Sequence, residues 1–312
     1  MRILLASLAI IVAVYVSSAP PAAQRGPAAD PLVRENALVK LADHSWVIPD
    51  NFVPMVPNVG IIVGSRGTLV IDPGMGRRNA ETVLREVAKV SKNAELYVAS
   101  THWHIEHTAG IAAFPPTAKH IGSPIQEAEF ADGAPAQAGN FGARSPLHAE
   151  LLRDMVWRKA DLPFDREYLL DLGGVRVRML VVGPTHTRGD TVFFVEGDTV
   201  LFAGDVVMNN SFVAATQDSS VKAWLTAYDV LEKWGPATIV PAHGAVGSGA
   251  LIGVNRAFMR EIDARARELK GQGRTIDEVE TTVQKEMQAK HPTWARVNGA
   301  AGAARAAYRE AR

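Results

Sequence analysis

Short apolar runs that are rich in β-branched residues and bounded by glycine and proline predict two successive groups of β-strands. The first group comprises residues 45–49, 58–64, 67–72 and 94–100. The second group comprises residues 166–172, 175–183, 191–197, 199–205 and 238–244. Because helical patterns accompany both groups, we expect two packed α/β halves.

Apolar residues at helical spacing predict the helices that accompany these strands. Residues 77–92 place their valines on one face, as expected of an amphipathic helix that follows the first strands. Further helices are predicted at residues 221–235, 250–270 and 275–290. The last of these opens with a capping box formed by Thr275 and Glu278. The end of the chain is therefore expected to be helical.

Residues 124–165 interrupt the pattern, because they are polar, rich in glycine and alanine, and only weakly periodic. We expect an insertion here, with one helix near residues 147–160, that borders a pocket. The two groups of strands lie on either side of it.

The N-terminus has the parts of a secretory signal peptide. Arg2 precedes the apolar run at residues 3–16, and small residues follow up to a cleavage site expected near Ala23. The run is shorter than the roughly 20 apolar residues that span a membrane, and an uncleaved anchor is the alternative. We therefore expect a periplasmic or secreted protein that has no membrane contact after signal cleavage.

These patterns give an expected domain organisation. It consists of a signal peptide at residues 1–23, a loose leader at 24–40, a main domain at 41–255 and a C-terminal helical extension at 256–312.

Composition narrows the possible kinds of site. The 312-residue chain carries 33 basic and 33 acidic side chains, so its formal net charge is zero. The charge therefore gives no indication of a nucleic acid as partner. It contains no cysteine, which excludes disulfides, thiolate ligands and a cysteine nucleophile. Any metal must therefore be held by histidine, aspartate or glutamate, and we expect a small-molecule substrate. Nothing in the sequence indicates an oligomeric state.

The segment THWHIEHTAG concentrates three of the nine histidines beside a carboxylate, at His102, His104, Glu106 and His107. A helix would place His102 and Glu106 on one face and turn the other two away. A strand would separate His107 from the rest. Only a loop can gather all four, and we expect one between a buried strand and a helix that begins near Thr108.

Neutral imidazoles and a carboxylate are natural ligands of a divalent metal such as zinc. The H-E-x-x-H signature of zinc proteases is absent. The H-x-x-E-H signature is absent too, because the residue three positions before Glu106 is Trp103 and not histidine. Trp103 itself is expected either to wall a pocket or to pack beneath the loop. Three further candidate ligands stand where later strands break into glycine-containing loops: His186, Asp205 and His243.

This ordered set resembles the metallo-β-lactamase-fold hydrolase superfamily. The resemblance extends from Ser45 to Gly247 through the segments NVGIIVGSRGTLVIDPG, GPTHTRGD, FAGD and PAHG in addition to the histidine loop. It implies an α/β fold, a four-layer αββα sandwich with metals between the two sheets at one edge, here with a C-terminal helical extension.

The resemblance also implies roles for individual residues. A first zinc would be held by His102, His104 and His186, and a second by Glu106, His107 and His243. Asp205 would bridge the two ions, and Asp72 would steady the histidine loop through hydrogen bonds. Two zinc ions about 3.5–4 Å apart would lower the pKa of a shared water, and the resulting hydroxide would attack a carbonyl carbon.

Glu106 departs from the family's usual H-x-H-x-D-H loop, because glutamate is one methylene longer than aspartate. Three outcomes are open: two zinc ions, one zinc ion with Glu106 as general base, or a different metal such as iron. Both His107 and His243 are present, which favours two metals.

The bridging aspartate resembles the glyoxalase-II-like branch, which implies a small ester, thioester or lactone as substrate. β-Lactamases with a cysteine ligand carry a lysine three positions beyond it, whereas this chain has Asp205 and Met208. Metallo-β-lactamase activity remains an alternative. Others are a mononuclear iron persulfide dioxygenase, using His102, His104 and Asp205 or His186, and a non-catalytic binding protein with a decayed site. The G-x-S-x-G elbow of serine hydrolases is absent.

Overall fold

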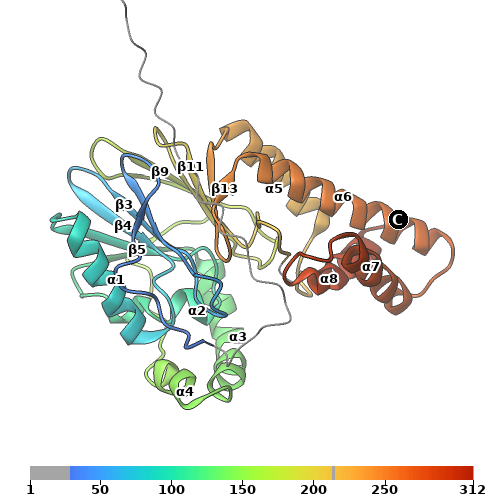
Figure 1. Ribbon diagram of the computed structural model, residues 1–312, viewed down its shortest axis with the longest axis horizontal. Coiled ribbons are helices and arrows are strands. Elements are labelled where there is room, and N and C mark those ends of the chain that lie inside the picture. The colour runs from blue at the N-terminus through green and yellow to red at the C-terminus, as the bar shows by residue number, and fades with distance from the viewer. Residues whose placement is uncertain (1–28, 213–214, 312) are drawn as a thin grey trace, which may run out of the picture.

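The computed structural model describes residues 29–212 and 215–311. Two mixed β-sheets lie at its centre, with helices on the outer side of each (Figure 1). The expected signal peptide lies outside the described residues. Among the described helices, none is both long and apolar enough to cross a membrane.

The first sheet has seven strands in chain order, β1 to β7. They are β1 (Val39–Lys40), β2 (Ser45–Ile48), β3 (Val59–Val63), β4 (Gly67–Ile71), β5 (Glu95–Ala99), β6 (Lys119–Gly122) and β7 (Leu162–Pro163). The strands are antiparallel from β1 to β4 and parallel from β4 to β7.

The second sheet has six strands in the order β13-β12-β11-β10-β9-β8. They are β8 (Glu167–Asp171), β9 (Arg176–Val181), β10 (Thr191–Val195), β11 (Val200–Gly204), β12 (Thr238–Pro241) and β13 (Gly247–Ser248). It repeats the plan of the first sheet, because an antiparallel run from β8 to β11 is followed by a parallel strand, β12.

Helices connect and cover the sheets. They are α1 (Gly76–Val90), α2 (Ile105–Thr108), α3 (Pro124–Gly142), α4 (Pro146–Leu152), α5 (Val221–Trp234), α6 (Ala250–Gly271), α7 (Ile276–Lys290) and α8 (Ala300–Glu310), with 3-10 turns η1 (Ile111–Ala113) and η2 (Val297–Gly299). Figure 1 shows α1 beside the first sheet and α5 and α6 on the opposite side of the molecule.

The central strands are buried on both faces, and alternate residues serve different layers. Leu69 and Ile71 of β4 pack between the two sheets, where they meet Phe193 and Phe202 of the second sheet. Val70 faces the other way and packs with α1 residues. The outer face of the second sheet packs against α5 to α8 in a separate cluster. The four-layer αββα sandwich and the C-terminal helices are therefore confirmed.

Two expectations about the helices were wrong. The helix after the histidine loop begins at Ile105, not near Thr108, because His104 O accepts hydrogen bonds from His107 N (2.9 Å) and Thr108 N (3.1 Å) and starts the turn early. The expected insertion contains the long helix α3 in addition to the shorter α4. Ser123 caps α3 by accepting a hydrogen bond from Gln126 N, and tertiary contacts described below hold it in place.

One other local expectation was confirmed. The capping box of Thr275 and Glu278 opens α7 as the sequence indicated. Helix α6 runs continuously across residues 255 and 256, where the sequence suggested a domain boundary. The described part of the leader, residues 29–40, contacts α1, and Val33 N donates a hydrogen bond to Asn79 Oδ1 (2.8 Å).

Helix α5 anchors the chain just after Asp205. Trp224 Nε1 and Tyr228 Oη both donate hydrogen bonds to Val206 O, at 2.9 and 3.0 Å. Both side chains are buried in the cluster between α5 and the second sheet. The position of Asp205 therefore depends on packing behind the sheet.

We predict that Tyr228→Phe lowers the free energy of unfolding by about 1 kcal/mol, because it removes one hydrogen bond but leaves Val206 O paired with Trp224. Urea denaturation measures the change. Tyr97→Phe is the matched control, since its hydroxyl contacts Glu95 at the surface, and it should change stability by less than about 0.5 kcal/mol. An equal effect of the two variants would contradict the prediction.

Candidate metal centre

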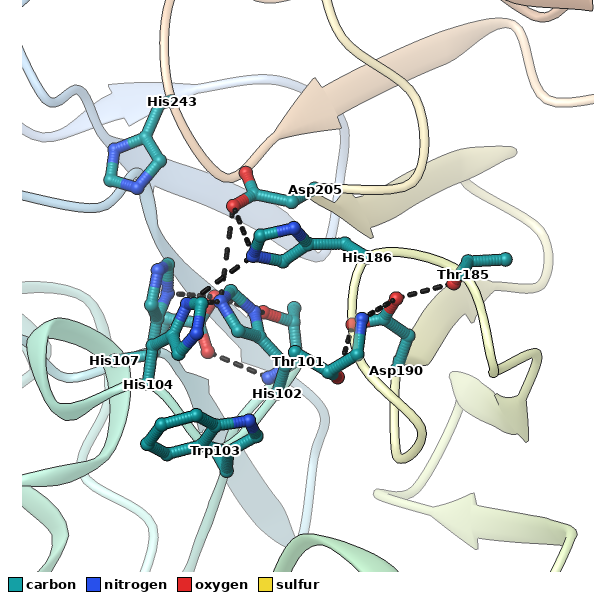
Figure 2. Close-up of polar contacts among 12 residues, drawn as sticks. Thr101, His102, Trp103, His104, His107, Thr185, His186, Asp190, Asp205 and His243 are labelled. Carbon is teal, nitrogen blue, oxygen red and sulfur yellow. Dashed lines mark hydrogen bonds and ion pairs between the residues drawn. The ribbon is translucent and has the colours of Figure 1, made fainter. Parts of the chain in front are cut away.

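The predicted ligands and the supporting residue Asp72 come from loops at the carboxyl ends of five strands, where the two sheets meet. Asp72 follows β4, the histidine loop follows β5, Asp205 follows β11 and His243 follows β12. The loop between β9 and β10 adds His186. Figure 2 shows the side chains of the five histidines and of Asp205 pointing toward one another. The repeated strand–helix–strand plan thus directs both halves of the protein to one place.

A first group consists of His102, His104 and His186, whose nearest ring nitrogens all lie within 4.8 Å of one another. His104 Nδ1 is 3.0 Å from His102 Nε2 and 3.3 Å from His186 Nε2. Ligands at 2.0–2.1 Å from a tetrahedral zinc are about 3.3 Å apart. The three nitrogens therefore have the spacing of three ligands to one ion.

Asp205 lies against this group from the other sheet. Its Oδ2 is 3.5 Å from His186 Nε2 and 3.8 Å from His102 Nε2. It also forms a possible ligand set with His102 and His107. A carboxylate shared between two sets of donors is what a bridging ligand requires.

A second group consists of Glu106, His107 and His243, which again have ligand atoms within 4.8 Å of one another. Glu106 and His107 are neighbours on the short helix α2. The helical backbone there places the carboxylate of Glu106, which is one methylene longer than aspartate, beside His107 and His243. The ring centroids of His102 and His107 are 4.1 Å apart. The two groups are therefore adjacent.

Asp72 organises the start of the histidine loop. Its Oδ1 accepts a hydrogen bond from Thr101 N (2.7 Å), and its Oδ2 accepts one from Thr101 Oγ1 (2.8 Å). Oδ2 also lies 3.0 Å from His107 Nδ1, which leaves Nε2 of that ring to face the second group. Asp72 has a left-handed backbone, with φ of 56°. These hydrogen bonds are of the kind that the resemblance implied for Asp72, whose role beside a metal site stays a prediction.

Burial sets the protonation of three of the histidines. It lowers the pKa of His102, His104 and His243 well below the usual value, and neighbouring positive charges add to the effect. These imidazoles are therefore neutral at physiological pH, which is the form that binds metals.

The nearby carboxylates raise the pKa of His107, whereas burial lowers the pKa of the other three histidines. Burial lowers the pKa of that ring, but the negative charges of Asp72, Glu106 and Asp205 outweigh burial and raise it to about 9. Burial also raises the pKa of Glu106. The negative potential at His107 favours a positive charge there, whether a proton or a metal ion.

Several donor atoms in this centre are buried without a hydrogen-bond partner. They are Glu106 Oε2, His107 Nε2 and Asp205 Oδ1. Leaving a buried polar atom unpaired costs about 1–3 kcal/mol. A divalent cation would satisfy these atoms together, so the donor set fits a dinuclear site of nitrogen and oxygen ligands. Their role as metal ligands stays a prediction.

The close approach of the two halves requires glycine at position 204. Gly204 has φ of 58°, and a Cβ there would lie 2.9 Å from Thr101 Cβ. A larger residue would push Asp205 away from the histidine loop. The glycine of the FAGD segment is therefore needed both for its backbone conformation and for its size.

The His186 loop is held by Asp190, which the sequence quoted only as part of GPTHTRGD. Its carboxylate accepts hydrogen bonds from Thr185 Oγ1, from Thr187 N (2.9 Å) and from Thr187 Oγ1 (2.7 Å). These bonds close the loop around His186, as Figure 2 shows.

The His243 loop is held from the first sheet by residues that sequence reasoning missed. Asn58 Nδ2 donates to Pro241 O and Gly244 O, both at 2.8 Å. Asp50 Oδ2 accepts a hydrogen bond from Gly244 N (2.8 Å). His243 Nδ1 lies 3.0 Å from Val56 O, which leaves Nε2 for the metal group.

Helix α3, in the expected insertion, connects the two ligand loops. Gln126 Nε2 lies 3.1 Å from Thr101 O and 3.0 Å from Gly189 O. Glu129 accepts a hydrogen bond from Gly189 N (2.8 Å), and Gln137 Oε1 accepts one from Ile105 N (2.9 Å). The weak periodicity of this segment gave no signal of these contacts.

Trp103 packs between the histidine loop and α3. A Cβ at Gly133 would lie only 2.3 Å from the indole ring, so the helix passes directly beside it. The indole also makes an edge contact with the His104 ring, at 4.5 Å between centroids. Trp103 therefore packs against the loop, the second of the two roles expected.

Comparison with protein families gives one match. The family described as the metallo-beta-lactamase superfamily matches residues 53–243, more than half of the chain. The matched range ends at His243 and contains every predicted ligand.

Two curated relatives are thioesterases by name. The chain is 22% identical over 210 residues to atrochrysone carboxyl ACP thioesterase of Aspergillus terreus, covering 67% of this chain and 55% of the relative. It is 27% identical over 176 residues to acyl-coenzyme A thioesterase MBLAC2 of Homo sapiens, covering 50% of this chain and 60% of the relative. The chain thus spans less than two thirds of either relative's length.

Solved structures share the fold at lower identity. The sec-alkylsulfatase Pisa1 from Pseudomonas sp. matches 88% of this chain and 50% of its own, with a TM-score of 0.69 and 17% identity. A metallo-beta-lactamase from Pontibacter korlensis matches 72% of this chain and 98% of its own, with a TM-score of 0.57 and 18% identity.

We predict that protein purified without chelator carries two divalent ions per chain. Glu106→Gln should weaken binding of the second ion at least about tenfold, because it replaces a carboxylate ligand with an amide. Glu106→Asp should keep both ions. Elemental mass spectrometry and zinc titration measure the stoichiometry and affinity.

His243→Ala should leave one ion, held by the first group, whereas His44→Ala should leave both, because His44 contacts Asp198 outside the centre. A wild-type protein with one ion that survives His243→Ala would contradict the two-ion interpretation.

We also predict that Gln126→Leu lowers the free energy of unfolding by about 1–3 kcal/mol and weakens metal binding, because carbonyl oxygens of both ligand loops lose their shared donor. Gln137→Leu, which removes a single bond to Ile105 N, is the matched control and should cost less. Denaturation and zinc titration of both variants test the connection. Unchanged metal affinity in Gln126→Leu would show that α3 does not position the ligands.

Proposed function

The chain belongs to the metallo-beta-lactamase superfamily, and we propose that it is a zinc-dependent hydrolase that cleaves thioesters or related small esters and lactones. One observation carries the proposal. Two adjacent donor groups, joined by Asp205, contain buried ligand atoms that no other group of the described protein satisfies.

Each donor group has a distinct task in this proposal. His102, His104 and His186 would hold one ion, and Glu106, His107 and His243 would hold the other. Asp205 would contribute to both. Zinc supplies a Lewis acid that polarises a carbonyl and lowers the pKa of water.

The protein's own residues keep this arrangement fixed. Asp72 contacts His107 and accepts a hydrogen bond from Thr101, and these contacts would hold the histidine loop in place when substrate binds. Burial keeps the imidazoles neutral and strengthens electrostatic interactions within the centre. No cysteine is available as a nucleophile, which agrees with direct attack by water.

The substrate class rests on the relatives and on one pair of residues. Both relatives described above are named as thioesterases, although each is longer than the aligned region. Asp205 and Met208 replace the cysteine and lysine expected of one class of β-lactamase. These features support the glyoxalase-II-like interpretation over hydrolysis of β-lactams.

The proposed location is the periplasm or the outside of the cell. Its support is the sequence of residues 1–23, with a basic start, a short apolar run and small residues. Substrates would then be thioesters or esters that reach this compartment.

We predict that zinc-loaded protein releases thiol from acyl N-acetylcysteamine and acyl-coenzyme A thioesters. A disulfide reagent can follow the reaction without background, because the chain contains no cysteine. Chelation should abolish turnover, and added zinc should restore it. Asp205→Asn should lower kcat/KM at least about a hundredfold through loss of the shared ligand.

Asp43→Asn, at a highly exposed carboxylate, is the control and should leave turnover unchanged. Several results would overturn the proposal. They are turnover of nitrocefin without thioester cleavage, oxygen consumption with a persulfide by an iron-loaded form, or stoichiometric capture of ligand without turnover.

A further inference from the structure

The candidate ligands of the second group are held by two different parts of the fold. Glu106 and His107 follow the start of the histidine loop, which Asp72 holds through two hydrogen bonds from Thr101. His243 comes from a separate loop after β12. The second group is therefore complete only when both loops are in place.

The segment between β2 and β3, residues 49–58, contacts the His243 loop from the first sheet, and we call it the β2–β3 loop. Asn58 N donates a hydrogen bond to Ala242 O (2.7 Å). Asn58 Nδ2 donates one to Gly244 O (2.8 Å). A single buried asparagine therefore binds the residues directly before and directly after His243.

Asp50 completes the contact. Its Oδ2 accepts a hydrogen bond from Gly244 N (2.8 Å), and its Oδ1 accepts one from Phe52 N (3.0 Å). Asp50 N donates to Asn58 Oδ1 (2.8 Å), so the two side chains belong to one network. Asp50 thus binds the N–H of Gly244 while Asn58 binds its carbonyl.

The same loop also fixes the imidazole ring. His243 Nδ1 lies 3.0 Å from Val56 O. A carbonyl oxygen can only accept, so this contact selects the tautomer that is protonated at Nδ1 and leaves Nε2 free to bind a metal. The Val56 side chain is buried in the cluster between the first sheet and α1. Both the backbone and the ring of His243 are therefore held by the β2–β3 loop.

The backbone of the β2–β3 loop is strained. Asn51, Phe52 and Met55 have φ of 50°, 59° and 62°, in the left-handed region that residues with a Cβ rarely adopt. Such conformations persist only where surrounding contacts determine them, and they cluster at functional sites. The network of Asp50 and Asn58 supplies contacts of this kind, and it connects the strained loop to a candidate ligand.

We propose that Asn58 and Asp50 are positioning residues for the second metal ion and that they act by fixing His243. This inference deepens the proposed function and rests on its two-ion centre. Loss of the network would free the His243 loop but leave the first group in place. Among the described residues, no hydrogen bond joins His102 or His104 to the β2–β3 loop.

Asn58→Asp is the informative variant, because it keeps the shape of the side chain. It also keeps an acceptor for Asp50 N, but it replaces the Nδ2 donor with an oxygen that faces the carbonyls of Pro241 and Gly244. The variant should bind the second ion about 10- to 100-fold more weakly, as expected when support for a metal ligand is lost. Affinity for the first ion should not change. Competitive zinc titration and elemental mass spectrometry measure both ions.

Asp50→Asn is a second variant of unchanged shape, which tests the network from its other end. It replaces one carboxylate oxygen with a donor, although both oxygens accept from backbone N–H groups. It should show the same selective loss of the second ion.

Asn79→Asp is the matched control. Asn79 is buried like Asn58, donates through Nδ2 to Pro31 O (3.0 Å) and Met75 O (2.9 Å), and accepts from Val33 N (2.8 Å). It therefore makes the same kinds of bond, but it holds the leader against α1 and contacts no candidate ligand. Asn79→Asp should destabilise the protein to urea as Asn58→Asp does, yet retain both ions.

A combined variant tests whether Asn58 acts through His243. In a His243→Ala background, Asn58→Asp should have no further effect on zinc binding, because the residue that it positions is already gone. An additional loss there would overturn the proposal. Equal weakening of both ions by Asn58→Asp, or loss of an ion in Asn79→Asp as well, would indicate a general structural role and would also overturn it.

These titrations need no substrate, which keeps the two proposals separate. Selective loss of the second ion, without turnover of any thioester by the wild-type protein, would refute the hydrolase and leave the positioning role standing. Thioester turnover by a wild-type protein with two ions, both of which Asn58→Asp binds equally well, would refute the positioning role and leave the hydrolase standing. A wild-type protein that holds a single ion would overturn the positioning role whatever its activity.

Discussion

The main physical constraint on this protein is the crowding of buried imidazoles and carboxylates at the junction of its two sheets. His104 Nδ1 lies 3.0 and 3.3 Å from two other ring nitrogens, and the nearby Asp205 has an oxygen without a partner. Groups in this state are costly to bury unless a cation satisfies them together. The surrounding architecture keeps them in place: Asp72 beneath the histidine loop, and Gly204 where the two halves approach most closely.

The two halves reach this point through the same construction. Each contains an antiparallel run followed by a helix and a parallel strand, with α1 and β5 in one half and α5 and β12 in the other. Because parallel strands end at the same edge of a sheet, their loops converge. Helix α3 then connects the loops of both halves through Gln126. Ligand geometry and the packing of the two halves are therefore coupled, and damage to one is expected to affect the other.

The fold alone does not determine a substrate, because one architecture supports many activities. Solved structures that resemble this one include a sec-alkylsulfatase and a metallo-beta-lactamase. Differences in substrate between proteins of this fold must arise where their loops and extensions meet the common centre. In this chain the segment between α7 and α8 lies beside the loop after Asp205. The C-terminal helices cover the second sheet, and the segment between them contacts a loop that carries a candidate ligand.

The sequence by itself indicated nine of the strands, two packed α/β halves and the set of candidate ligands, because these depend on local patterns: apolar runs, and polar residues where such runs end. The four-layer fold was implied by the family resemblance, and the strands β1, β6, β7 and β13 were not predicted. His186, Asp205 and His243 were identified in this way, and the structure brings them together with the histidine loop. Only the tertiary structure showed the early start of α2, the existence of α3, and the supporting roles of Asn58, Gln126 and Asp190. These features depend on hydrogen bonds between residues far apart in the chain, which leave no periodic trace in the sequence.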